Sequence, residues 1–261
     1  MSLGATRVAL FAAVSIVLSL VSGPARAGEF QLVYRVSQEG AVVGAAIFSG
    51  VATEDDYTLR GVLRADVGPF AQSPVELIAV ASGDMSGQAL SWLRYALAVT
   101  ENSLRRETDL SNAPSGVVVR KTPEPDTTLT SIAVPRRAQD ALDPLTGLFQ
   151  AARSVRRQNS CDASVLVYDG SLMYRIDVSH GAFPMGGYAG GGYDGPAVRC
   201  RFRYALDGAQ AADANSAGPH EFRGEVWFAT PRGPTLAAPL RAILDTRRGQ
   251  LFFELHSYRV D

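Results

Sequence analysis

The sequence predicts a mainly β protein built on an antiparallel sheet, with one amphipathic α-helix packed on that sheet. Period-two alternation of apolar residues indicates the strands, turn-forming sequences lie between them, and only one segment has helical spacing. The alternating apolar positions are Phe30, Leu32, Tyr34 and Val36; Tyr57, Leu59, Gly61 and Leu63; Tyr174, Ile176 and Val178; and Leu251, Phe253 and Leu255. Such strands have one apolar and one mixed face, which is typical of sheets buried on one side.

The first residues of the chain have the pattern of a secretory signal peptide. Arg7 provides a positive start, Val8 to Val21 is an uncharged apolar run, and Ala25-Arg26-Ala27 is a small-x-small cleavage site. The apolar run is 14 residues long, short of the roughly 20 that a membrane-spanning helix needs. No cysteine lies near the cleavage point for lipid attachment. We therefore expect residues 1–27 to be removed and residues 28–261 to form a soluble, periplasmic protein without a transmembrane segment.

Turn-forming sequences separate the predicted strands and indicate hairpins, and hence antiparallel pairing. They are Gln38-Glu39-Gly40, Thr53 to Asp56, Asp169-Gly170, Asp207-Gly208 and Arg247-Arg248-Gly249. Segments 122–126 and 135–140 are expected to be loops that lead to the helix. The composition changes near residue 140, but hairpins on both sides fit one continuous sheet, so we predict a single domain over residues 28–261.

One segment has helical instead of alternating spacing. Asp143 is a typical N-cap residue, and Pro144 is tolerated at the first helical position. The apolar residues that follow are Leu145, Leu148, Phe149, Ala152 and Val155. Because they lie on one face of a helix, we predict an amphipathic helix from Asp143 to about Gln158 whose apolar stripe packs on the sheet.

The overall charge argues against a nucleic-acid partner. Basic and acidic side chains nearly cancel, with 25 Lys and Arg against 26 Asp and Glu, so no global field attracts nucleic acid or anionic lipid. The local basic excess of Arg153, Arg156 and Arg157 lies near the end of the predicted helix, where positive charge complements the dipole. We favour that interpretation over an anion-binding or membrane-surface patch.

Two cysteines, Cys161 and Cys200, lie in the part of the chain predicted to be exported. An even number of cysteines in an oxidising compartment favours a disulfide. A redox-active pair is more often Cys-x-x-Cys, and a zinc site needs two further ligands at suitable spacing. We therefore predict a structural disulfide between Cys161 and Cys200.

Two stretches, 181–195 and 207–219, look irregular and are predicted to be long surface loops. The glycine cluster from Gly186 to Gly192 does not fit a phosphate-binding loop, because no helix follows it, and we interpret it as a flexible hairpin connection. Tyr188 and Tyr193 lie in the first stretch, where they could stack on a ligand or close a pocket. These two tyrosines and His180, which ends a predicted strand beside the cluster, are the candidate ligand-binding residues.

The chain offers little support for catalysis. Its histidines, His180, His220 and His256, are isolated from one another and match no metal-binding motif. No Gly-x-Ser-x-Gly elbow is present, and no cysteine stays free once the disulfide forms. We predict no catalytic residue, no metal and no cofactor. If the protein were a hydrolase, its candidate catalytic group would be His180, with Asp177 or Asp194 as its partner.

The order of several short motifs resembles the DUF3108 family of exported bacterial proteins. These motifs are Tyr34, Gly40, Gly44 and Tyr57; Ser82-Gly83 before Arg94-Tyr95; Asp143-Pro144-Leu145; Cys161; Val167-Tyr168-Asp169-Gly170 with Tyr174; Gly195-Pro196-Ala197 before Cys200; Val226-Trp227-Phe228; and Pro239-Leu240-Arg241. The resemblance implies a periplasmic protein with a curved or spiral antiparallel sheet, open and barrel-like. It also implies a structural cysteine pair and brings no catalytic residue.

Three functions are compatible with these patterns. The first is a non-catalytic envelope protein whose concave apolar face carries an apolar or lipid-like ligand or a lipoprotein, since many half-apolar strands share only one covering helix. The second is a scaffold that binds other envelope proteins through its edges or its tyrosine-rich loops. The third is a periplasmic hydrolase acting on cell-wall or glycan material through His180. The size of an apolar cavity separates the first from the second.

Overall fold

The structure is a computed structural model that describes residues 28–66, 73–85, 90–123, 134–181, 186–207, 221–229, 237–246 and 249–260. Three predicted features lie outside the described residues: the leader 1–27, His220, and the loop 207–219 except for Asp207. Of the predicted turn Arg247-Arg248-Gly249, only Gly249 is described.

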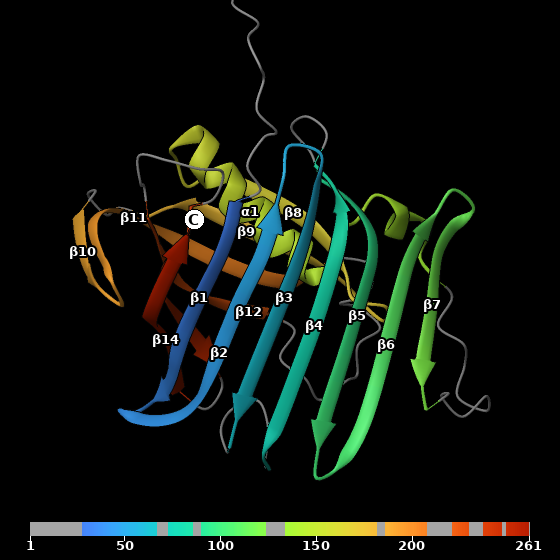
Figure 1. Ribbon diagram of the computed structural model, residues 1–261, viewed down its shortest axis with the longest axis horizontal. Coiled ribbons are helices and arrows are strands. Elements are labelled where there is room, and N and C mark those ends of the chain that lie inside the picture. Colours follow the sequence, from blue (N-terminus) through green and yellow to red (C-terminus); the bar gives the residue numbers. More distant parts are fainter. Residues whose placement is uncertain are drawn as a thin grey trace, which may run out of the picture.

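Antiparallel strands make up most of the described chain (Figure 1). They are β1 (Gly28–Gln38), β2 (Ala41–Ala52), β3 (Asp56–Ala65), β4 (Val75–Asp84), β5 (Ser91–Glu101), β6 (Leu104–Ala113), β7 (Gly116–Thr122), β8 (Ala163–Tyr168), β9 (Met173–His180), β10 (Gly186–Gly190), β11 (Tyr193–Leu206), β12 (Glu221–Ala229), β13 (Pro239–Thr246) and β14 (Gly249–Val260). All belong to one sheet in the order β7-β6-β5-β4-β3-β2-β1-β14-β13-β12-β11-β9-β8, with β10 paired to β11 alone.

The sheet is strongly curved and does not close. Strand β1 pairs with β2 on one side and with β14 on the other, which joins the two halves of the chain into one surface. The ends of the path are β7 and β8. Figure 1 shows β14 and β1 to β7 in front and β8, β9 and β12 behind them, with a helix also behind the front strands. The predicted mainly β fold, with an open, curved antiparallel sheet and one covering helix, is confirmed.

The helix α1 (Pro144–Gln158) lies inside the curve, beside β3, β4, β8 and β9. Its N-cap is Asp143, whose side chain accepts hydrogen bonds from the backbone N–H groups of Leu145 and Thr146, both at 3.0 Å. Just before the helix, the indole N–H of Trp92 donates to the carbonyl of Ala141 at 2.7 Å. These bonds satisfy buried polar groups and confirm the predicted helix start. Among the described residues, no helix has the length and apolar content needed to span a membrane.

The core lies on the concave face, around the helix. Phe149 of α1 is 1% exposed and packs on Phe30 and Tyr57, with ring centroids 6.0 and 5.8 Å apart. The inward positions of β1, from Phe30 to Val36, are all buried, as their alternation predicts.

Cys161 and Cys200 form the predicted disulfide, with their Cα atoms 5.4 Å apart. Cys161 follows the end of α1, and Cys200 lies in the middle of β11. Both residues are buried, so the bond links the C-terminal end of the helix to the sheet.

Two predicted loops contain regular structure. The glycine cluster forms the predicted hairpin, but segment 181–195 is not a long loop throughout, because Gly186–Gly190 forms β10 and pairs with the start of β11. The reason is that Gly191 and Gly192 have φ of +61° and +85°, which allows the two-residue turn of a tight hairpin. In the predicted loop 135–140, Arg136–Gln139 forms a short 3₁₀ helix, η1.

Candidate ligand-binding cavity

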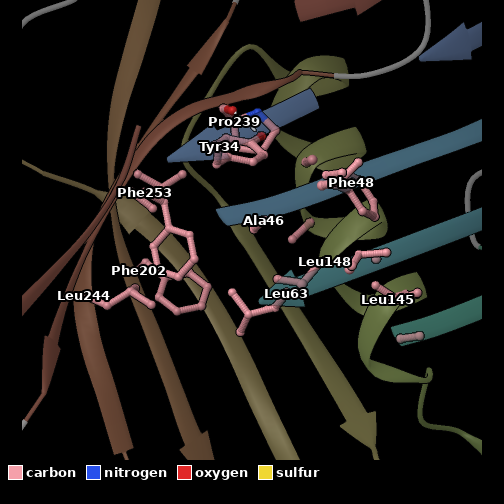
Figure 2. A pocket seen from close by; sticks show the side chains of 18 of the residues that line it. Tyr34, Ala46, Phe48, Leu63, Leu145, Leu148, Phe202, Pro239, Leu244 and Phe253 are labelled. Atoms are coloured by element: carbon pink, nitrogen blue, oxygen red, sulfur yellow. Dashed lines mark hydrogen bonds between the residues drawn. The ribbon is translucent and has the colours of Figure 1, made fainter. Parts of the chain in front are cut away.

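A cavity of about 480 Å³ lies on the concave face, between the two halves of the sheet and beside α1. Its volume lies within the roughly 300–1,000 Å³ range of small-molecule sites. Figure 2 shows its lining, with Phe253, Phe202 and Leu244 on one side and Leu63, Leu145 and Leu148 on the other. Residues from both halves of the chain therefore form one apolar space.

The strand register produces the wall formed by β1 to β5. Residues opposite one another on neighbouring strands share a face of the sheet, and two such rows line the cavity. The first, here called the Tyr34 row, consists of Tyr34, Ala46, Leu63 and Leu77. The second, the Phe48 row, consists of Phe48, Gly61, Ala79 and Leu97. Small residues in both rows leave room that larger side chains would fill.

The facing wall comes from the second half of the chain. Val178 on β9 is opposite Phe202 on β11, and Ala242 on β13 lies between Val226 and Phe253. All five residues line the cavity. Several are only partly buried because the cavity separates this wall from the wall of β1 to β5.

The helix lines the cavity without filling it. Leu145, Leu148, Ala151 and Ala152 all line the cavity. Leu148 belongs to the apolar stripe that was expected to pack on the sheet, but it is 45% exposed. This part of the prediction is wrong, because the sheet curves away from Leu148 and leaves the cavity beside it. An apolar side chain so exposed on a concave face is unusual in a fully packed core.

The polar groups that line the cavity are mainly two tyrosines. The hydroxyl of Tyr34 donates to the carbonyl of Pro239 at 2.6 Å. Burial raises the pKa of Tyr34, and the nearby Tyr188 raises it further. Burial also raises the pKa of Tyr95, with further increases from Asp143 and Asp169. Both phenols therefore remain uncharged at physiological pH.

Arg241 also borders the cavity, but its guanidinium group lies elsewhere. The group is over the ring of Trp227, 5.3 Å from the centroid, and is 3.6 Å from the carboxylate of Glu254. Trp227 and Glu254 are its partners on the neighbouring strands. Arg241 precedes the inward-facing Ala242, so the alternation of β13 directs its side chain to the convex face. The described wall of the cavity thus has no charged group inside it.

Tyr188 and Tyr193 lie in the β10–β11 hairpin, at the end of the cavity next to Tyr34. The hydroxyl of Tyr188 donates to the carbonyl of Leu240 at 3.3 Å. The ring of Tyr193 meets that of Tyr258 edge-on, with centroids 5.9 Å apart. Both side chains pack against the core around the cavity, but neither is among the residues that line it. The half-buried tyrosines of the hairpin therefore pack beside this end of the cavity.

His180 is exposed at the end of β9 and does not line the cavity. Asp177, three residues earlier, accepts a hydrogen bond from Ser164 at 2.7 Å and pairs with Arg203 on the outer face. Asp194 lies six residues before Cys200, the β11 partner of His180, which places it about 20 Å away along the strand. No hydrogen bond or ion pair joins His180 to either carboxylate within the described chain, so the structure does not assemble the catalytic group considered above.

The residues of the cavity were only partly identifiable from the sequence. Tyr34, Leu63 and Phe253 belong to the alternating runs, which indicate an inward face. Phe202 and Leu244 were not singled out, and in β13 the consecutive apolar residues Ala242, Ile243 and Leu244 give no alternation that would identify an inward face. The sequence also does not show which inward faces remain apart once the sheet curves.

No protein-family model matches this chain, and no curated protein matches it significantly. Among solved structures, the chain is similar to one described as the crystal structure of a beta-barrel-like protein of domain of unknown function DUF1849 from Brucella abortus. The two share 10% sequence identity with a TM-score of 0.49, and the alignment covers 91% of this chain and 99% of the other.

Proposed function

We propose that this protein is a periplasmic, non-catalytic carrier that binds an apolar or lipid-like ligand in the cavity between α1 and the curved sheet. One observation supports the proposal most directly. The single helix does not fill the concave face, and Leu148 remains 45% exposed beside a cavity of about 480 Å³. An exposed apolar surface of this kind is stabilised when an apolar ligand displaces water from it.

The same observation favours a carrier over a scaffold. A fully packed concave face would leave only the edges and loops for binding partners. The tyrosines considered for such contacts, Tyr188 and Tyr193, instead pack on Leu240 and Tyr258 of the same chain. Export to the periplasm follows from the leader pattern of residues 1–27, and membership of the DUF3108 family from the motif order. Both remain part of this proposal.

The test uses two neighbouring alanines on β2. Ala46 lines the cavity, whereas Ala45 is exposed on the opposite face. We expect the purified protein to bind the uncharged fluorescent probe N-phenyl-1-naphthylamine saturably. Ala46→Trp should abolish this binding by filling the cavity, and Ala45→Trp should leave it unchanged. Circular dichroism confirms that both variants are folded.

Two results would contradict the carrier proposal. One is the absence of saturable probe binding to the unmodified protein after organic extraction of any resident ligand. The other is an equal loss of binding in both alanine variants, because a probe bound in the cavity must distinguish the two faces of β2. Native mass spectrometry of protein purified without detergent complements the test, since a resident ligand gives an added mass that extraction removes.

A further inference from the structure

Both rows of the cavity wall continue beyond the cavity, the Tyr34 row to β6 and the Phe48 row to β7, and each ends in a cation. Beyond Leu77 in the Tyr34 row come Val99 on β5 and Arg106 on β6. Beyond Leu97 in the Phe48 row come Thr108 on β6 and Lys121 on β7. Directly opposite residues share a face, so both cations are on the concave face. Each lies two strand spacings, about 10 Å, beyond the cavity wall.

Arg106 is accessible from the concave side. Its side chain is 56% exposed, and its guanidinium group lies 3.3 Å from the carboxylate of Glu101. This contact uses one edge of the guanidinium group, which has five N–H donors. Because exposed ion pairs are weak, with a median of about 0–1 kcal/mol, Glu101 leaves Arg106 able to bind another anion.

Lys121 has a neutral partner. Its ammonium group donates to the hydroxyl of Ser171 at 2.5 Å, and no carboxylate lies within ion-pair distance of it in the described part of the chain. Asp169, two residues before Ser171, accepts hydrogen bonds from the backbone of Ser171 and Leu172 and from the hydroxyl of Tyr174. An ammonium group has three donors, so two remain available to a ligand.

Apolar rows that end in cations match the chemistry of an acidic amphiphile. Resting on the carrier function proposed above, we infer that the ligand has one long hydrocarbon chain, held in the cavity, and a carboxylate or phosphate headgroup that binds Arg106 and Lys121. Within the described residues, the wall of the cavity has no charged group inside it, so the headgroup stays at β6 and β7. Charge complementarity therefore fixes the orientation of the ligand.

The cavity volume sets the size of the hydrocarbon chain. A methylene group occupies about as much space as a water molecule, roughly 30 Å³ in the liquid. A cavity of about 480 Å³ then accommodates on the order of 16 carbon atoms. Each buried methylene contributes about 0.8 kcal/mol, so the chain provides most of the affinity and the headgroup provides the selectivity.

The experiment compares probes that share a sixteen-carbon chain, roughly the size given by the cavity, and differ in their headgroup. These are hexadecanoate, hexadecyl phosphate, hexadecanol and hexadecyltrimethylammonium, each displacing N-phenyl-1-naphthylamine from the full exported chain below its micelle concentration. We expect the two acidic probes to bind about tenfold more tightly than the alcohol, as two partly exposed ion pairs allow, and the cationic probe to bind more weakly. A preference between the acidic probes identifies carboxylate or phosphate as the better headgroup.

The variants locate the headgroup. Arg106→Gln combined with Lys121→Gln should remove the preference for acids and leave the affinity for hexadecanol unchanged. Arg105→Gln is the matched control, because Arg105 is the next residue of β6, is 58% exposed and faces the convex side opposite Thr100. The Arg105→Gln protein should still bind the acidic probes more tightly than hexadecanol. Raising the salt concentration should weaken the binding of the acids and not that of the alcohol.

The outcomes separate this inference from the carrier proposal. If hexadecanol binds as tightly as the acids, or if Arg105→Gln lowers the acid preference as much as the double variant, the headgroup site is wrong and the carrier proposal stands. If none of the probes binds and N-phenyl-1-naphthylamine does not bind either, the carrier proposal itself is wrong.

Discussion

At the scale of single residues, Asp143 combines a structural and an electrostatic role. Its side chain is fully buried and caps α1 through the N–H groups of Leu145 and Thr146. Burial raises its pKa from 3.8 to about 6, although the hydrogen bonds from Thr146 and Leu145 lower it. The cap therefore stabilises the helix start, while the buried charge opposes folding at neutral pH.

The raised pKa of Asp143 predicts a pH dependence with a definite sign. The folded state binds the proton more tightly than the unfolded state, so the free energy of unfolding decreases as the pH rises from about 4 to about 6 and then levels off. A shift of about two units corresponds to roughly 3 kcal/mol. Asp143→Asn keeps an N-cap acceptor and removes the charge, so this component of the pH dependence should disappear.

Urea unfolding between about pH 4.5 and about pH 7.5 measures the free energy of unfolding of the unmodified protein and of Asp143→Asn. The contributions of all other titrating groups are the same in both proteins and cancel when the two free energies are subtracted. The Asn variant should be at least as stable near pH 7 and lose that relative advantage as the pH falls. Asp143→Ala also removes the charge but has no cap acceptor, so it should be less stable than Asp143→Asn by about 1 kcal/mol or more. A constant difference between the Asp and Asn proteins across this pH range would contradict the assignment.

At the scale of elements, the β10–β11 hairpin shows how glycines determine a close contact. Gly191 lies at the turn with a φ of +61°, and a Cβ atom there would be 2.5 Å from the carbonyl oxygen of Leu255 on β14. The turn thus packs directly on the backbone of β14. Gly192 also has a positive φ, of +85°, but a Cβ atom there would have no heavy atom within 4 Å.

These two glycines form a matched pair for testing how the hairpin is held. Gly192→Ala should cost about 1–2 kcal/mol, the penalty of a left-handed conformation for a residue with a side chain. Gly191→Ala has the same penalty and must also move the turn away from Leu255, which should break the hydrogen bond from Tyr188 to Leu240. Hydrogen exchange of the β10 amides should therefore accelerate more in Gly191→Ala. Equal acceleration in both variants would show that the hairpin is not docked on β14.

The sequence predicted elements better than it predicted their three-dimensional neighbours. Asp143-Pro144 marks the helix start because capping is a local interaction, and the alternation from Phe30 to Val36 marks a strand for the same reason. The hairpin around Gly191 was predicted, but its regular strand β10 was not, since glycine is compatible with both a loop and a strand. The cavity depends on how far Leu148 lies from Leu63 and Phe202, and that distance depends on the curvature of the whole sheet.

At the scale of the whole molecule, the disulfide connects the helix to the far wall of the cavity. The loop between Cys161 and Cys200 spans 39 residues and contains β8, β9 and β10. Of these strands, β8 is at the edge of the sheet, and among the described residues its outer side pairs only through the single bridge between Leu142 and Val167. The covalent bond is thus an additional constraint on the segment that forms the back wall of the cavity.

Breaking this bond should therefore lower the stability of the entire fold. A loop of 39 residues corresponds to about 4 kcal/mol in the chain-entropy model, which lowers the melting temperature by about 10 °C for a chain of this size. Calorimetry with and without reductant measures the change, and mass spectrometry verifies that the thiols have formed. The Cys161→Ala, Cys200→Ala double variant should melt near the temperature of the reduced protein and be insensitive to reductant. If the verified reduced protein melted at the same temperature as the oxidised one, strand pairing and α1 alone would hold the back wall, and the disulfide would have no part in keeping the cavity formed.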